Sequence, residues 1–330
     1  MEPSATRIHP TIETSIKPIR LAPLERMMAR WFDQIEKGQL TIEFPSGHRQ
    51  LFSQGESSPQ ALLQIRDPKL IVRMLFSGDL GLAESYLNGD WETPNLSALL
   101  TVGAINLDAL SDALESGLLS RLQGRLRHAM RANTRRGSRR NIAAHYDLGN
   151  AFYQPWLDPT MTYSSALFDD MNEPLERAQE RKYARLAETL DIQPGDRVLE
   201  IGCGWGGFAE FAASKFDCEI VGLTLSTEQA LYARTRMEKA GLANRVDIRL
   251  QDYRDVDGLF DKIVSIEMFE AVGVAHWPVY FDTLRNRLKP GGRAAVQTIT
   301  IEEARFDAYR RTPDFIQHYI FPGGVLPSPE

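Results

Sequence analysis

Val-Leu-Glu-Ile-Gly-Cys-Gly-Trp-Gly-Gly, residues 198–207, joins a short apolar run to a turn with four glycines in six positions. A segment with helical spacing follows it. Glycines let the backbone turn sharply and approach a ligand closely, and a helix N-terminus presents free N–H groups. This stretch therefore predicts a strand, a turn and a helix with a ligand at the turn, and a purely structural turn is the alternative.

Four more apolar runs alternate with helical patterns after this turn. The runs are Glu219–Leu223, Val246–Leu250, Lys262–Ile266 and Ala294–Thr298. Helical patterns cover 227–240 and 278–288, and another, 175–190, precedes Val198. Such alternation predicts an α/β fold with a doubly wound, mostly parallel, Rossmann-like sheet.

The composition of the turn bears on its ligand. A dinucleotide site has G-x-G-x-x-G and an acid at the end of the next strand for the ribose. Here the turn reads G-x-G-x-G-G, and the next strand ends Gly-Leu-Thr-Leu-Ser at 222–226, without an acid. A nucleoside without a pyrophosphate fits better. We therefore expect S-adenosylmethionine (SAM), with Glu200 available to its amino group and Asp252 near its adenine.

The first third of the chain has a different pattern. Leu40–Phe44 and Arg49–Phe52 flank Pro-Ser-Gly-His and predict a hairpin, while helices are expected from Pro68 to Phe76 and over 96–114. We expect four segments: a leader at 1–22, a smaller mixed α+β domain at 23–120, an arginine-rich linker at 121–140 and a SAM-binding domain at 141–330.

Length and composition restrict the class of protein. The chain has 330 residues, 43% hydrophobic and 25% charged, with a net charge of −6. These values are typical of a globular protein and give no general reason to expect nucleic acid binding. No apolar run reaches the ~20 residues of a membrane span, and the N-terminus lacks the apolar core of a secretory signal. Cys203 and Cys218 have no CxxC or histidine partner, so we expect a reducing cytoplasm and no metal site.

Further motifs carry a resemblance to a known family. Val-Gly-Leu-Thr-Leu-Ser-Thr-Glu-Gln at 221–229 and Leu-Gln-Asp-Tyr-Arg-Asp at 250–255, together with the glycine turn, resemble the cyclopropane-fatty-acyl-phospholipid synthase family. Segments at 144–150, 158–164, 268–270 and 319–324 resemble its other signatures. The resemblance covers about residues 65–328. It implies a class I methyltransferase fold, a lipid-handling N-terminal domain, and addition of the SAM methyl carbon across a cis double bond of an unsaturated phospholipid acyl chain.

The resemblance also implies which residues hold SAM. Matching positions are Tyr163, Ser164, the turn Gly202, Cys203, Gly204, Trp205, Gly206 and Gly207, then Thr224, Gln229, Gln251 and Asp252. Thr224, Ser226 and Gln229 supply neutral hydroxyl and amide groups where an NAD enzyme uses a carboxylate, which agrees with the argument from the residues.

The resemblance implies a second ligand, bicarbonate, as the base that removes a proton after methyl transfer. Glu270 and the backbone of Ile299 match two of the family's ligand positions. Ser165 stands where the family has cysteine, and Gln297 where it has histidine. Both can donate hydrogen bonds to an anion, but neither adds positive charge. We therefore expect weaker anion binding, with Glu270, Ser165, Gln297, Ile299 and Tyr163 as the catalytic candidates.

Aromatic faces can stabilise the carbocation that methyl transfer creates. The candidates in or beside the signature segments are Tyr146, Tyr153, Trp156, Tyr163, Phe168 and Phe269. Ordinary core packing is the alternative for each of them. His145 is a candidate base, and a hydrogen bond that fixes its loop explains it equally well.

Eight arginines and no acidic residue lie between Glu115 and Asp147. A solvated linker is one interpretation of this run, Arg121–Arg140. Attraction to anionic phospholipid is another, at ~1 kcal/mol per basic residue near a surface. With a phospholipid-modifying resemblance, we favour a peripheral position at the cytoplasmic face of the membrane, and no nucleic acid partner.

The main hypothesis is a SAM-dependent methyltransferase that forms cyclopropane fatty acids. Ser165 and Gln297 leave two alternatives: a methyl-branched, uncyclised product, or a lipid-binding homologue with impaired catalysis. A small-molecule methyltransferase is a further alternative. The resemblance implies two more strands and a tyrosine of the anion site beyond residue 330, so we expect a shortened catalytic domain with an exposed sheet edge. A homodimer is left open.

Overall fold

The computed structural model describes residues 21–55, 58–114, 149–311 and 314–329. The chain divides into two compact units, Met1–Ser120 and Arg121–Glu330, and each is described by itself. Residues 1–20 of the leader expected at 1–22, the arginine run, His145 and Tyr146 lie outside the described residues.

The first unit contains a small mixed sheet with helices. Its elements are α1 (Pro23–Phe32), β1 (Gln39–Glu43), β2 (Arg49–Phe52), β3 (Gln60–Ile65), α2 (Lys69–Leu87), β4 (Trp91–Glu92), α3 (Leu96–Ile105) and α4 (Leu107–Leu114). The strand order is β2-β1-β3-β4. The expected hairpin is present, with Leu40 opposite Phe52, whereas β3 pairs parallel to β1 and was not expected.

The helix expected over 96–114 is two helices, α3 and α4. Asn106 separates them because its buried side chain binds the chain elsewhere: its Oδ1 accepts from the backbone N–H groups of Glu36 and Lys37, both at 2.9 Å. The helix expected from Pro68 to Phe76 continues to Leu87 as α2, with a kink at Gly78, where φ is +56°.

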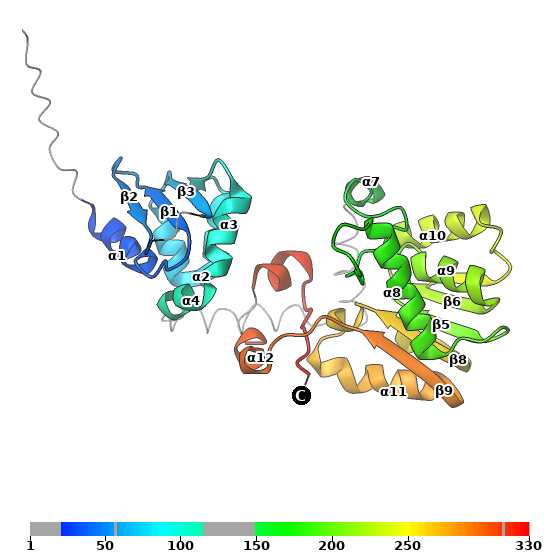
Figure 1. The fold of residues 1–330 in the computed structure, drawn as a ribbon. Coiled ribbons are helices and arrows are strands. Elements are labelled where there is room, and N and C mark those ends of the chain that lie inside the picture. Colours follow the sequence, from blue (N-terminus) through cyan, green and yellow to red (C-terminus); the bar gives the residue numbers. More distant parts are fainter. Residues whose placement is uncertain (1–20, 56–57, 115–148, 312–313, 330) are drawn as a thin grey trace, which may run out of the picture. The chain divides into compact units, whose positions relative to one another are not determined.

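The second unit contains a five-stranded parallel sheet in the order β7-β6-β5-β8-β9 (Figure 1). Its strands are β5 (Arg197–Ile201), β6 (Glu219–Thr224), β7 (Val246–Leu250), β8 (Phe260–Ile266) and β9 (Leu288–Gln297). Its helices and short turns are α7 (Asn150–Tyr153), α8 (Leu175–Leu190), α9 (Gly207–Phe216), α10 (Thr227–Lys239), η1 (Tyr253–Asp255), η2 (Phe269–Ala271), η3 (Val274–His276), α11 (Trp277–Arg287), α12 (Glu303–Tyr309) and η4 (Ile316–Ile320). The predicted α/β class and all five predicted strands are confirmed.

One strand boundary was wrong. The sequence predicted a strand that begins at Ala294, but β9 begins at Leu288 and includes residues 289–292. The ladder shifts register there, since Phe260 pairs with Leu288 and Lys262 with Arg293. Between these two pairs β9 has more residues than β8, and Gly291, at φ +78°, lies in the resulting irregularity of the strand.

Apolar side chains cover both faces of this sheet. One buried cluster joins the sheet to α8, α9 and α10 through residues such as Leu190, Ala212 and Met237. The other joins it to α11 through Tyr280 and Leu284 (Figure 1). These two layers hold the carboxyl ends of the strands in fixed positions. Across the described ranges, no helix combines the length and apolar character that a bilayer span requires.

Candidate active site

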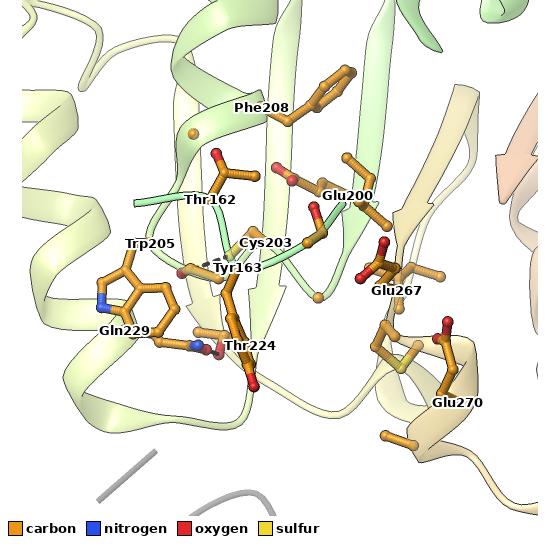
Figure 2. Close-up of a pocket in the computed structure, with 18 of the residues that line it drawn as sticks. Thr162, Tyr163, Glu200, Cys203, Trp205, Phe208, Thr224, Gln229, Glu267 and Glu270 are labelled. Carbon is orange, nitrogen blue, oxygen red and sulfur yellow. Dashed lines mark hydrogen bonds between the residues drawn. The ribbon is translucent and has the colours of Figure 1, made fainter. Parts of the chain in front are cut away.

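A cavity of about 740 Å³ lies at the carboxyl ends of β5, β6 and β8. Doubly wound sheets bind ligands at this edge, where loops leave the strands toward helices on opposite faces. Side chains from α8, the loop before it, η2 and the C-terminal segment complete the wall. Figure 2 shows Trp205 and Gln229 toward one side of this view, and Glu267 and Glu270 toward the other.

Most of the sequence-predicted residues meet in this one cavity. Those that line it are Tyr163, Ser164, Ser165, Glu200, Gly202, Cys203, Gly204, Trp205, Gly207, Thr224, Gln229, Gln251, Glu270 and Ile299. Gly206, Ser226, Asp252 and Gln297 are not in its lining. Their roles in binding stay predictions.

The glycine turn between β5 and α9 requires glycine at its first position. Gly202 has φ +84°, and a Cβ placed there would lie 2.8 Å from Met268 Cγ. The backbone N–H groups of Gly202 and Cys203 donate to Leu223 O at 3.0 and 2.8 Å, which ties the turn to the neighbouring strand. The turn therefore leaves an open cradle beside the cavity, as close approach of a ligand requires.

The polar groups after β6 bind one another. Thr224 Oγ1 donates to Gln229 Oε1 at 2.7 Å, and Ser226 Oγ accepts from Gln229 N at 3.3 Å as the cap of α10. Ser226 thus positions the helix, while Thr224 and Gln229 reach the cavity. The neutral character that the sequence indicated here is maintained by this network.

Asp252 has a partner that the sequence analysis did not foresee. Its carboxylate accepts from Arg254 Nε at 2.8 Å and from Arg254 Nη2 at 2.6 Å, and both side chains are less than 10% exposed. The hydrogen bond with Asp252 raises the pKa of the arginine. The carboxylate proposed for adenine is therefore held in a bidentate ion pair beside the cavity.

Glu200 is buried at the end of β5 and lines the cavity. Its Oε2 is a buried acceptor without a hydrogen-bond partner among the described residues. Burial raises the pKa of this carboxyl well above its ordinary value, and Lys182 and Arg236 oppose that shift. An ammonium group in the cavity would satisfy this oxygen, so the site fits the amino group of SAM.

Aromatic side chains form part of the cavity wall. The ring centroids of Tyr153, Trp156 and Tyr163 lie 5.3–5.5 Å apart, and Trp205 lies 5.0 Å from Tyr153. Trp156, Tyr163 and Trp205 line the cavity. These faces can stabilise a cation there.

Two other aromatic candidates lie elsewhere. Phe269 packs 5.0 Å from Tyr280 in the core, so the packing interpretation applies to it. Phe168 is 37% exposed and does not line the cavity.

Glu267 occupies the centre of the expected anion site. Its Oε1 accepts from Ser165 N at 2.9 Å, Ser165 Oγ at 2.7 Å and Gln297 Nε2 at 2.9 Å. The residue follows β8 with φ +49°, an uncommon left-handed conformation for glutamate that directs chain and side chain at this point. The donors that resemblance assigned to bicarbonate therefore bind a carboxylate of the protein itself.

Glu270 and Ile299 meet as the resemblance implied. Ile299 N donates to Glu270 Oε1 at 2.5 Å. Glu270 Oε2 is buried without a hydrogen-bond partner in the described part of the chain. Burial is the largest cause of the raised pKa of this carboxyl, and the Ile299 hydrogen bond opposes it. A carboxyl that keeps its proton to higher pH than usual thus lies in the same cavity as the acceptor Glu267.

Three residues of this site, Glu267, Gln179 and Lys182, were not predicted from the sequence. Glu267 directly precedes the Met-Phe-Glu segment at 268–270. A carboxylate at the end of a predicted strand could have identified it as a site residue. Gln179 lines the cavity, and Lys182 lies on the same helix within an otherwise apolar stripe. A lysine in a buried stripe is unusual enough to have marked α8 as part of the site.

The fold, the glycine cradle and the buried acceptors define a class I, SAM-dependent methyltransferase. The family model "Mycolic acid cyclopropane synthetase" matches residues 133–330. The chain therefore belongs to the mycolic acid cyclopropane synthetase family, which confirms the resemblance found in the sequence.

Individual relatives differ in their named activities. The chain is 43% identical over 283 residues to tuberculostearic acid methyltransferase UfaA1 of Mycobacterium tuberculosis, covering 83% of this chain and 66% of that protein. It is 39% identical over 271 residues to the cyclopropane-fatty-acyl-phospholipid synthase of Escherichia coli, covering 82% of this chain and 68% of that protein. A probable fatty acid methyltransferase of Pseudomonas putida is 43% identical, covering 56% of this chain and 48% of that protein.

Solved structures agree with the fold. Mycolic acid cyclopropane synthase CmaA1, complexed with S-adenosylhomocysteine (SAH) and CTAB, is 34% identical with a TM-score of 0.54, over 58% of this chain and 70% of that one. Cyclopropane synthase MmaA2 of Mycobacterium tuberculosis gives the same TM-score at 33% identity, over 58% and 70% of the two chains. The matched regions span about two thirds of the length of UfaA1 and of the Escherichia coli synthase, and about half of the length of the Pseudomonas putida relative.

Proposed function

We propose that this protein transfers the methyl group of SAM to a cis double bond of an unsaturated phospholipid acyl chain. The observation that carries the proposal is the shared cavity, in which the glycine cradle, the aromatic wall and the carboxyls of Glu200, Glu267 and Glu270 meet. Relatives named for fatty acid methylation and for phospholipid cyclopropanation support a lipid acceptor.

SAM supplies an electrophilic methyl group, and the π pair of the alkene forms the new C–C bond as the S–CH₃ bond breaks. The acyl chain is then a carbocation that must lose a proton. An alkene is a weak nucleophile, so the apolar part of the cavity has to exclude water and align the reactants. The faces of Trp156 and Tyr163 stabilise the cation.

Glu267 is our candidate for the proton acceptor in place of bicarbonate. A bound carboxylate offers the same two acceptor oxygens as bicarbonate, and Ser165 and Gln297 already donate to it. Its geometry supports activity without an added anion. Bicarbonate binding stays the alternative implied by resemblance.

The two candidate functions differ in the product that forms when the carbocation loses its proton. Loss of a proton from the transferred carbon with ring closure gives a cyclopropane, whereas loss from the chain gives a methyl-branched alkene. If Glu267 replaces bicarbonate as the base, the proton can be taken from a different carbon. We therefore keep the branched product as the second candidate. The relative UfaA1 is named as a methyltransferase and not as a cyclopropane synthase.

Incubation of the full chain with labelled SAM and unsaturated phospholipid vesicles tests the proposal. We expect SAH and an acyl chain heavier by one CH₂, with no product from saturated vesicles. Catalytic hydrogenation then separates the products, because the branched alkene takes up hydrogen under conditions that leave a cyclopropane intact. SAH formed only with soluble acceptors would overturn the lipid assignment, and absence of turnover with SAH still bound would favour the lipid-binding alternative.

We propose further that the protein acts at the cytoplasmic face of the membrane, attracted by Arg121–Arg140. The support is the density of positive charge in that run and a lipid substrate. Co-sedimentation with anionic vesicles should fall as salt rises, and neutral vesicles should bind weakly. Salt-insensitive binding would contradict this electrostatic interpretation.

A further inference from the structure

Lys182 is a buried amine beside the cofactor cavity. It lies on α8, is 4% exposed, and its Nζ donates to Ser164 Oγ. The Tyr183 ring centroid lies 5.0 Å from Nζ. A buried lysine requires compensation for its lost hydration, so its position next to a ligand cavity requires an explanation.

The direction of this hydrogen bond determines what Ser164 can do. A lysine ammonium has only donors, whereas a hydroxyl has one donor and two acceptor lone pairs. Ser164 Oγ therefore accepts from Lys182, and its own O–H is directed elsewhere. Because Ser164 lines the cavity, that hydrogen is available to an acceptor there.

Gln179, one turn earlier on α8, holds the same serine from its backbone. Gln179 Nε2 donates to Ser164 O at 2.8 Å, and the side chain is 1% exposed. Its Oε1 has no hydrogen-bond partner among the described residues and, like Glu200 Oε2, is a buried acceptor on a cavity-lining residue. Two acceptors and one hydroxyl donor match the ammonium and the carboxylate of an amino acid.

We propose that Lys182 is a positioning residue for SAM: its ammonium orients the Ser164 hydroxyl to donate to the carboxylate of the methionine moiety. This inference rests on the proposed SAM site and names the part of the cofactor that Ser164 recognises. A neutral amine can accept a hydrogen bond from Ser164 instead, which would remove the donor from the cavity. Binding of the cofactor carboxylate therefore requires the charged form of Lys182.

The surroundings of Lys182 set the pH at which this occurs. Burial lowers its pKa to about 8, while Glu267, Asp158 and Glu200 oppose the shift. The ammonium is thus lost as pH rises through about 8. Affinity for the carboxylate should decline over that range.

Calorimetric titration with SAH tests the proposal, using decarboxylated SAH as the matched probe. For Lys182→Met we expect at least about a tenfold weaker SAH affinity at pH 7 and less than a twofold change for the decarboxylated probe. Between pH 7 and 9 the wild-type affinity for SAH should fall more than its affinity for the decarboxylated probe. The Lys182→Met variant should lose this difference. Lys215→Met, at an exposed position of α9, is the control.

Ser164→Ala separates positioning from folding. If Lys182 acts through Ser164, Lys182→Met adds less than twofold in the Ser164→Ala background. Lys182→Arg keeps the positive charge. It should therefore retain part of the difference in affinity between SAH and decarboxylated SAH. Equal weakening of both probes by Lys182→Met would overturn the proposal, and failure of the wild type to bind SAH would overturn the SAM site itself.

Discussion

Gln297 Nε2 donates to Ser165 Oγ at 3.1 Å, although the two residues are separated by 132 positions in the sequence. Both also donate to Glu267 Oε1. Three segments thus converge on a single carboxylate oxygen: the loop before α8, the end of β8 and the end of β9. This arrangement has consequences for the chemistry that can be measured.

Glu267→Gln should lower turnover by at least about 100-fold, because the amide cannot accept a proton. SAH affinity should change less than twofold, since the substitution keeps the size of the side chain. Steady-state rates with unsaturated vesicles, together with calorimetry, measure both quantities. Glu238→Gln, exposed on α10, is the control.

The anion dependence of the reaction provides a second readout for Glu267. Wild-type rates should be equal in bicarbonate-depleted and bicarbonate-containing buffer, and Glu267→Ala should regain activity with added bicarbonate, which can occupy the vacated space. A wild-type enzyme that stops when bicarbonate is removed would contradict the assignment of Glu267 as the base.

Glu270→Gln should reduce turnover far more than SAM affinity. The acid lies beside Glu267 and is held by the backbone of Ile299, so the substitution changes proton placement at the reacting centre. Measuring kcat together with the SAH dissociation constant checks this. Equal loss of both would identify Glu270 as a structural residue.

Glu200→Gln should have opposite effects on ligand binding and on stability. The raised pKa means that the folded protein holds its proton at pH values where the unfolded chain has released it, so burial of Glu200 lowers stability as pH rises above 4.5. The ligand-free variant should therefore melt at a higher temperature than wild type at pH 8, and at nearly the same temperature near pH 4.

The same substitution should weaken SAH binding at least about tenfold, because the ammonium loses a carboxyl that can give up its proton and carry the opposite charge when the ligand binds. Calorimetry at pH 7 measures this loss beside the thermal data. Unchanged SAH affinity would remove Glu200 from the cofactor site and leave its burial without a functional explanation.

The sequence was sufficient to predict the second unit because both of its signals are local. Each strand is a short apolar run, and the turn at Gly202 is marked by its glycines. The break at Asn106 and the pairing of β3 with β1 were missed because they depend on contacts between distant segments. Likewise, the resemblance located Ser165 and Gln297. The contact of both residues with Glu267 could not be predicted, because it depends on three segments that are distant in the sequence.

Asp252→Ala should first destabilise the fold. The sequence placed Asp252 at the adenine, yet its carboxylate binds Arg254 in a buried bidentate pair. The substitution removes the carboxylate that pairs with the buried guanidinium of Arg254, at a cost of about 3 kcal/mol. Denaturant unfolding measures this loss, and comparison with Arg254→Gln shows whether the pair or the carboxylate matters. Weaker SAH binding by Asp252→Ala alone would support the adenine contact.

Gly202→Ala should weaken SAM binding through the shape of the turn. A φ of +84° is a strained backbone conformation for alanine, and the added Cβ would lie 2.8 Å from Met268 Cγ. The backbone must move to relieve both problems, which displaces the turn residues that line the cavity. We expect SAH affinity to fall by about tenfold or more. A Cβ at residue 202 would also lie 2.9 Å from Met268 Cβ, so Met268→Gly is the change that removes both contacts. Combined with Gly202→Ala it leaves only the backbone strain, and the double variant should recover part of the affinity; full recovery would show that the side-chain contacts alone set the requirement for glycine.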